Sequence, residues 1–205
     1  MSAASWTRKI ILPIGEQRAL RETDYFDSRN VQDRFKGIPT EDIKAFLGQE
    51  SSGLTIIASN EIKDFNWGSV VRSVNSFGAK RIIFTGRRAY NRRGAVGAQN
   101  YTQVDYDERP VTELFADLRA QGYTIIAAEY DERFDMVSLE RYTFDPKTAI
   151  IFGEEGLSLS EEILKDVDDV VYIPMHGSVK SLNLASAATT FMYAYNVSTR
   201  YPNTV

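Results

Sequence analysis

The sequence contains no cysteine and only one histidine, His176, among its 205 residues. The lack of cysteine excludes disulfides, thiolate metal sites and cysteine nucleophiles, and it fits a reducing compartment such as the cytoplasm. One histidine also excludes a metal site built from several imidazoles. We therefore expect a cytoplasmic protein whose chemistry needs no metal ion.

Long apolar runs are also missing. No run approaches the about 18 residues of a membrane-spanning helix, so no contact with a membrane is expected. The first six residues lack a basic region followed by an apolar core, which predicts that there is no signal peptide. The apolar fraction of 43% suits a globular protein with a sizeable core.

Acidic residues are absent from residues 65–104, although the whole chain has a net charge of −4. The same segment holds seven basic residues, among them the pairs Arg87-Arg88 and Arg92-Arg93. A basic segment on an acidic protein predicts a localised contact with a polyanion. A solvated basic face is the other interpretation, and the composition alone leaves both open.

The usual nucleotide fingerprints are missing as well. No G-x-G-x-x-G follows the first predicted strand, and there is no Walker-type lysine loop, which argues against a dinucleotide-binding domain. Strands are predicted at residues 54–58, 81–85, 124–128, 149–152 and 170–173, and helices at 66–77, 111–120 and 183–195. This alternation predicts an α/β fold, a mostly parallel sheet flanked by helices with ligands at the carboxyl ends of its strands.

Residues 1–50 have mixed charge and several Pro and Gly breaks, and they are interpreted as an N-terminal extension. Short helices are predicted at residues 29–36 and 40–47, with Thr40 as the N-cap of the second.

Three loops after predicted strands carry polar residues. The first runs from Asn66 to Arg72, the second is Gly153-Glu154-Glu155-Gly156, and the third runs from Ile173 to Asn183. Each also has a structural interpretation: Asn66, Ser181 and Asn183 as helix caps, Arg72 as a surface residue, and the two glutamates as acids near a helix N-terminus. His176 is interpreted as a turn residue.

Together and in this order, the three loops resemble the SpoU (TrmH-like) branch of the SPOUT RNA methyltransferases. The family pattern N-x-G-x-x-x-R is matched by Asn66, Gly68 and Arg72. The pattern G-x-E-G is matched by Gly153, Glu155 and Gly156, and I-P-M-x-G-x-x-x-S-L-N is matched from Ile173 to Asn183. The resemblance covers roughly residues 54–196, so the extension lies outside it.

The resemblance implies a methyltransferase domain over residues 51–200 with a C-terminal trefoil knot that binds S-adenosylmethionine. It also implies a homodimer. The residues expected to line the cofactor site are Ala128, Glu129, Gly153, Gly156, Ile173, Met175, Ser181 and Leu182.

The implied reaction is methyl transfer to a ribose 2′-hydroxyl of RNA. Arg72 matches the family's catalytic arginine, and because a guanidinium is a poor base, stabilising the developing alkoxide or gripping a phosphate suits it better. The other implied active-site residues are Asn66, Glu155, Ser181 and Asn183, with Glu155 expected to orient Arg72 or Asn66. Arg87, Arg88, Arg92 and Arg93 would hold RNA phosphates. Tyr90 and Tyr101 would either stack on unpaired bases or pack within the protein.

A tRNA substrate is favoured over rRNA for two reasons. The chain shows no N-terminal ribosomal-protein-like substrate domain, and residues 122–126 with Glu129 resemble tRNA-directed relatives. The alternatives are an rRNA ribose methyltransferase, a base-methylating SPOUT enzyme and a catalytically silent RNA-binding protein. The presence of Asn66 and Arg72 favours the ribose-modifying branch, and the presence of Arg72 and Asn183 argues against a silent protein.

Overall fold

A computed structural model describes residues 27–61 and 65–200. The chain divides into two compact units, residues 1–37 and 38–205, and each is described by itself. In the first unit, the helix predicted over residues 29–36 is wrong, because only the single 3-10 turn η1, Asp33–Phe35, forms there. The signal-peptide prediction concerns residues outside the described part.

The second unit is built around a seven-stranded sheet. Its strands are β1 (Thr55–Asn60), β2 (Arg81–Gly86), β3 (Val104–Asp107), β4 (Thr124–Ala128), β5 (Met136–Ser138), β6 (Thr148–Phe152) and β7 (Asp169–Tyr172). They lie in the order β3-β2-β1-β6-β4-β7-β5, and every pairing is parallel. The predicted α/β class with a mostly parallel sheet is therefore confirmed.

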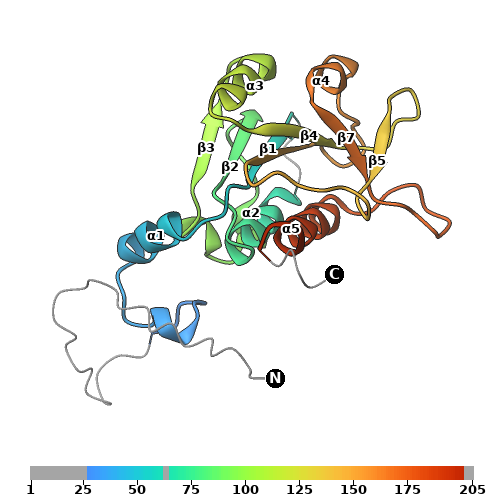
Figure 1. The fold of residues 1–205 in the computed structure, drawn as a ribbon. Helices are drawn as coiled ribbons and strands as arrows, with labels where there is room; N and C mark the ends of the chain where they lie inside the picture. Colours follow the sequence, from blue (N-terminus) through green and yellow to red (C-terminus); the bar gives the residue numbers. More distant parts are fainter. Residues whose placement is uncertain (1–26, 62–64, 201–205) are drawn as a thin grey trace, which may run out of the picture. The chain divides into compact units, whose positions relative to one another are not determined.

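Helices cover both faces of this sheet (Figure 1). The α-helices are α1 (Thr40–Gln49), α2 (Trp67–Ser76), α3 (Val111–Ala120), α4 (Glu161–Asp166) and α5 (Leu184–Arg200). Helices α2 and α5 lie on one face and α3 and α4 on the other. Two short 3-10 turns, η2 (Arg92–Ala95) and η3 (Ala98–Asn100), follow β2.

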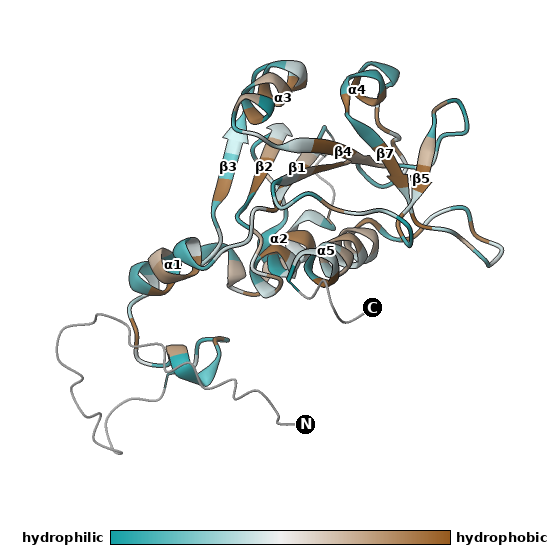
Figure 2. Cartoon of the chain, in the orientation of Figure 1, coloured by the Kyte–Doolittle hydropathy of each residue, from teal (hydrophilic) through white to brown (hydrophobic). Residues whose placement is uncertain are grey.

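The core is split between the two faces because successive side chains of a strand point in opposite directions. Ile56 of β1 packs toward α2 and α5, whereas Ile57 packs toward α3 and α4. The strands are apolar on both sides, as buried parallel strands are, and Figure 2 shows the hydrophobic colour concentrated in β1 and β4. No helix of the described residues is long and apolar enough to span a membrane.

The strand order places the carboxyl ends of β1, β6, β4 and β7 next to one another. Ala58 of β1 is in register with Phe152 of β6, and Ala128 of β4 is in register with Val171 of β7. The three polar loops singled out in the sequence therefore start from one edge of the sheet, where ligands of such folds bind. The trefoil knot implied by the resemblance stays a prediction, since strand order and register do not trace the threading of the chain.

Some elements escaped the sequence patterns. Strand β3 alternates acidic and apolar residues at the edge of the sheet, β5 has only three residues, and α4 has six. Such short or edge elements carry little periodicity. Thr40 is the first residue of α1 rather than its cap, since Pro39 occupies the N-cap position.

Candidate functional site

The two helices that begin at the site edge, α2 and α5, pack against each other (Figure 1). The hydroxyls of Ser73 and Thr189 lie 2.8 Å apart between them. Nearer the far end, Asn196 Nδ2 donates to the carbonyl oxygen of Phe77 at 3.0 Å. These contacts hold the starts of both helices, and so Asn66 and Asn183, at the same end of the helix pair.

Asn66, Glu155 and Asn183 form a hydrogen-bonded triad, called here the amide–carboxylate triad. Asn66 Nδ2 donates to Glu155 Oε2 at 2.5 Å, and Asn183 Nδ2 donates to the same oxygen at 3.2 Å. Asn183 Nδ2 also donates to Asn66 Oδ1 at 2.8 Å. Because an ionised carboxylate can only accept, Glu155 fixes which way both amides point. One residue from each of the three sequence motifs thus meets at one place.

The two asparagines of the triad differ in whether they cap the helix that follows them. Asn183 Oδ1 accepts hydrogen bonds from the backbone N–H groups of Ala185 at 3.0 Å and Ser186 at 3.4 Å, so Asn183 caps α5 while it joins the triad. Asn66 stands at the N-cap position of α2, but its backbone is helical and its side chain makes no capping bond. Its amide is committed to Glu155 and Asn183 instead.

Arg72 and Ser181 stand apart from the triad. Arg72 is exposed on α2 and makes no hydrogen bond or ion pair with any described residue. Ser181 is exposed in the loop before α5 and likewise has no hydrogen-bond partner in the described part of the chain. Of the two residues that Glu155 was expected to orient, the structure places Asn66 against it.

Two buried polar residues behind the triad were missed by the sequence reasoning. Glu154 is buried although its neighbour Glu155 is exposed, and its carboxylate accepts a hydrogen bond from the backbone N–H of Glu61 at 2.8 Å. This contact ties the end of β6 to the end of β1. Asn60, fully buried, is the last residue of β1. The signal that could have found them is a polar residue at the end of an apolar strand, as for Asn60, or two positions beyond it, as for Glu154.

Asn60 clamps the arginine loop, residues 87–97, to the sheet. Its Nδ2 donates to the carbonyl oxygens of Arg87 at 2.5 Å and Ala89 at 3.2 Å, while the Arg87 N–H donates to the Asn60 carbonyl at 2.7 Å. Further along, a Cβ added at Gly68 would lie 2.2 Å from the carbonyl oxygen of Asn91. Glycine in the first motif therefore lets the arginine loop press onto the first turn of α2.

The four arginines of this loop are exposed. Arg88 forms an ion pair with Glu108, with Nε and Oε1 2.9 Å apart, whereas Arg87, Arg92 and Arg93 pair with no acid among the described residues. Three cations are thus presented to solvent from a braced backbone.

The two tyrosines near the arginine loop are packed within the protein. Tyr90 stacks on Phe84, with ring centroids 4.7 Å apart, and burial raises the pKa of its phenol. Tyr101 is 9% exposed. Of the two interpretations, the packing one is correct, and the two rings are not presented to bases.

The expected cofactor residues lie at the ends of β4, β6 and β7. Ala128 and Ile173 pack partly buried against the core. Glu129 braces the second loop, since its Oε2 accepts from the Leu159 N–H at 3.1 Å and its Oε1 from the Tyr130 N–H at 3.0 Å. Gly156 has a φ of +82°, a conformation that favours glycine.

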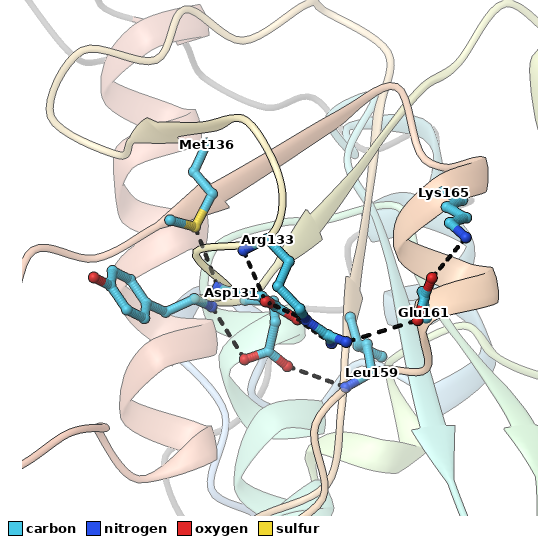
Figure 3. Close-up of polar contacts among 8 residues, drawn as sticks. Asp131, Arg133, Met136, Leu159, Glu161 and Lys165 are labelled. Atoms are coloured by element: carbon cyan, nitrogen blue, oxygen red, sulfur yellow. Dashed lines mark hydrogen bonds and ion pairs between the residues drawn. The ribbon is translucent and has the colours of Figure 1, made fainter.

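One ion pair, supported by two neighbouring ones, joins the segment after β4 to α4 (Figure 3). Arg133 reaches Glu161 at 3.6 Å, and Glu161 pairs with Lys165 at 2.6 Å. Arg133 also binds Asp131, and its hydrogen bonds lower the pKa of that carboxyl, which keeps it ionised. The charged side chains of this segment therefore hold the chain after β4 in place.

The third loop differs from both others. None of the described residues forms a hydrogen bond with the backbone of residues 174–182. Met175 is partly buried, and Leu182 is 40% exposed. Unpaired backbone groups beside apolar side chains suit a flat heteroaromatic ligand such as adenine, which offers polar edges and apolar faces. No group of three or more metal-ligating side chains occurs in the described residues.

Comparison with known proteins gives relatives that are similar to this chain over most of its length. A tRNA (guanosine(18)-2′-O)-methyltransferase of Escherichia coli is 25% identical over 150 residues, which cover 72% of this chain and 64% of that relative. The chain thus matches slightly less than two thirds of that protein's length.

Solved structures show the same fold. The A. aeolicus TrmH/SpoU tRNA modifying enzyme superposes with a TM-score of 0.69 at 20% identity, over 80% of this chain and 83% of that one. The SpoU methyltransferase AviRb from Streptomyces viridochromogenes, solved in complex with the cofactor AdoMet, gives 0.59 at 27% identity, over 69% and 56% of the two chains. The family match itself runs over residues 53–193 and takes in all three motifs and the whole triad, and the chain therefore belongs to the SpoU rRNA Methylase family.

Proposed function

We propose that this protein is an S-adenosylmethionine-dependent RNA methyltransferase that modifies a ribose 2′-hydroxyl, with tRNA as the favoured substrate. The observation that carries the proposal is the amide–carboxylate triad. Asn66, Glu155 and Asn183 come from the three separate family motifs, and hydrogen bonds of 2.5–3.2 Å join them at the carboxyl edge of the sheet. The named relative in E. coli modifies a guanosine ribose of tRNA.

The cofactor site lies at the ends of β4, β6 and β7. The residues that would hold S-adenosylmethionine are Ala128, Glu129, Gly153, Gly156, Ile173, Met175, Ser181 and Leu182. The backbone of residues 174–182, to which no described residue forms a hydrogen bond, suits the edges of adenine, and AviRb, on the same fold, binds AdoMet. When bound, the cofactor supplies a methyl group on a positively charged sulfur. Glu129 acts by bracing the second loop, because both its carboxylate oxygens accept from backbone N–H groups.

The guanidinium of Arg72 is available for contact with the RNA. It is exposed and has no partner among the described residues, so it is available to an incoming phosphate or to the ribose oxygen. The transfer would form an O–CH3 bond at the 2′-oxygen while the S–CH3 bond breaks, with the bonding pair left on sulfur and the hydroxyl proton released to water. A nearby cation would stabilise the negative charge that develops on that oxygen. Since a guanidinium is a poor base, Arg72 serves as an electrostatic stabiliser.

The triad and Ser181 position the reacting ribose. Glu155 fixes the two amides, and Asn183 at the same time fixes the start of α5 and so the end of the loop that carries Ser181. Alignment of two reactants in a fixed geometry can lower the activation barrier by several kcal/mol, about 7 or more in the best cases. The arginine loop adds phosphate contacts through Arg87, Arg92 and Arg93, with Arg88 partly engaged by Glu108.

The test is methyl transfer from radiolabelled S-adenosylmethionine to separate pools of unmodified tRNA and rRNA. Digestion to nucleosides then locates the label. Label on 2′-O-methylribose from tRNA is the expected result. Label on ribose only from rRNA would move the substrate to rRNA, the alternative that the family's name suggests.

Two further outcomes would contradict the proposal. Label on a base would place the protein with base-methylating SPOUT enzymes. RNA and cofactor binding without any transfer would make it a catalytically silent RNA-binding protein. An exposed Arg72 and an intact triad together argue against that last alternative.

Two attributes accompany the proposed function. We propose a homodimer, as the resemblance implies, and exposed apolar side chains such as Tyr193 on α5 and Val179 in the third loop are consistent with a buried surface in the assembly. Light scattering on the purified protein gives the mass directly. We also propose a cytoplasmic location, where tRNA is modified.

A further inference from the structure

Phe65 is the most exposed large apolar side chain of the described residues, at 78%, and it immediately precedes Asn66. An apolar ring in water is unremarkable in isolation. Phe65, however, directly precedes in the chain a triad residue whose side chain is held by two hydrogen bonds. Its backbone attachment is therefore fixed at the edge of the candidate site.

Other aromatic rings in this region are occupied within the protein. Trp67, two residues on, is fully buried and meets Phe84 edge-on, and Tyr90 and Tyr106 both stack on Phe84. Phe65 has no ring partner of this kind among the described residues. It is the aromatic surface that this part of the site offers to a ligand.

The arginine loop indicates which ligand reaches Phe65. The loop presses its Asn91 carbonyl onto Gly68 in the first turn of α2, and Phe65 lies directly before that turn. Phosphates held by Arg92 and Arg93 would thus bring the bases of the same strand to the N-terminal end of α2. Unstacked RNA bases commonly find an aromatic side chain as their new neighbour.

We propose that Phe65 stacks on an unpaired base of the RNA, at the methylated nucleotide or beside it. This inference rests on the proposed function. A ribose that reaches Arg72 and the triad must leave a helical stack, and its base or the adjacent one loses its stacking partner. Phe65 would replace that partner. Every base has a flat face that can stack on an aromatic ring. Phe65 would therefore contribute affinity without selecting one base over another.

The first test is RNA affinity, measured by fluorescence anisotropy with unmodified tRNA for Phe65→Trp, Phe65→Leu and the wild type. A stacking role predicts that Trp keeps the wild-type Kd within about twofold, whereas Leu raises it by about tenfold. The Kd for S-adenosylmethionine should be unchanged in all three, which also shows that each variant is folded. Equal Kd values for RNA in Leu and wild type would overturn the proposal.

The second test pairs the protein change with an RNA change. Abasic substitutions are placed at the modified nucleotide and at each neighbour, and their effects on Kd are combined with Phe65→Leu in a double-mutant cycle. Stacking predicts that the two losses are not additive at one of these positions. Additive losses at every position would overturn it, as would a fall in the mass of Phe65→Leu, which would assign Phe65 to an interface between two copies.

Failure of the proposed function and failure of the stacking role of Phe65 would give different experimental results. A wild-type protein that binds tRNA but transfers no methyl group would contradict the proposed function. The affinity comparison of Phe65→Trp with Phe65→Leu would still decide the stacking role, because it does not depend on turnover.

Discussion

On the β1–β2 side of the site edge, exposed side chains project from a clamped loop, whereas on the β6–β4–β7 side the chain presents its own backbone. Asn60 and Gly68 anchor the arginine loop, and Arg87, Arg92 and Arg93 point from it without acidic partners among the described residues. In contrast, no described residue bonds to the backbone of residues 174–182. We take the first side to serve RNA and the second to serve the cofactor.

The difference teaches how the two ligands would be recognised. A polyanion is held by cations whose spacing is fixed, so the loop that carries them is braced. A small heteroaromatic cofactor is read by N–H and C=O groups, so the loop that binds it keeps them unpaired. The amide–carboxylate triad joins the two sides, since Asn66 follows β1, whereas Glu155 follows β6 and Asn183 follows β7.

The sharpest test of this division is Arg72→Ala. Loss of a cation beside a developing oxyanion lowers turnover by about 10²–10³-fold. Because Arg72 belongs to the RNA side, the Kd for S-adenosylmethionine should stay at the wild-type value. Single-turnover methyl transfer and calorimetric cofactor binding measure the two quantities. A variant with full turnover would remove Arg72 from its assigned role.

The arginine loop should respond next most strongly. Replacement of Arg87, Arg92 and Arg93 by Ala is expected to weaken RNA binding by about 10²-fold at low salt, from about 1 kcal/mol for each contact. The slope of log K against log salt should fall by about 2–3, because three counterion releases are lost. Arg88→Ala is the matched control and should cost less, since Glu108 already neutralises that side chain. An unchanged slope would show the loop to be only a solvated face.

The clamp itself can be loosened without touching an arginine. Asn60→Ser removes the amide that reaches the Arg87 and Ala89 carbonyls, and it should destabilise the fold by about 1–3 kcal/mol. RNA affinity should fall by about tenfold, because the arginines lose part of their fixed spacing, while the cofactor Kd is retained.

A control on the same strand is Thr55→Val. Thr55 is fully buried at the opposite end of β1, and its hydroxyl has no partner within the described part of the structure. This change should leave both affinities unaltered. If Asn60→Ser and Thr55→Val behaved alike in RNA binding, the clamp would have no bearing on RNA.

The smallest effect concerns backbone strain in the arginine loop. Val96 has a φ of +48°, and a β-branched residue is rarely found in this left-handed conformation, which costs it about 1–2 kcal/mol. Val96→Gly should therefore raise the free energy of unfolding by about 0.5–1 kcal/mol after the entropy gained by the unfolded chain is deducted. Gly97→Ala, at φ +89°, should lower it. Urea unfolding of both variants measures the two changes in the free energy of unfolding. A decrease for Val96→Gly and an increase for Gly97→Ala would contradict backbone strain at Val96.

The sequence predicted the sheet well where periodicity was strong. The helix at residues 111–120 and the strand at 124–128 were predicted at their observed bounds, because apolar spacing marks both and Gly122 between them marks the end of the helix. The three motifs also identified Asn66, Glu155 and Asn183. The hydrogen bonds among them could not be predicted, since they join residues 28 to 117 positions apart in the chain.

The misses have physical causes. Glu154 and Glu155 are adjacent and chemically identical, yet one faces inward to Glu61 and the other outward to the amides. Nothing in a local pattern distinguishes them, because the direction depends on how β6 enters its loop. For Tyr90 the sequence left stacking on bases and packing within the protein both open, because only the fold brings its ring onto Phe84.

The most direct measurement of the central claim is single-turnover methyl transfer by Glu155→Ala, with Ser158→Ala as a control on an exposed residue of the same loop. If the triad joins the RNA and cofactor sides, Glu155→Ala should transfer about 10²-fold more slowly because two oriented amides lose their shared acceptor. Its Kd values for RNA and for S-adenosylmethionine should each stay within about threefold of wild type, since a loss of this size is consistent with misalignment and not with lost binding. Transfer at the wild-type rate would contradict the account, and so would a loss explained entirely by weaker binding of either ligand.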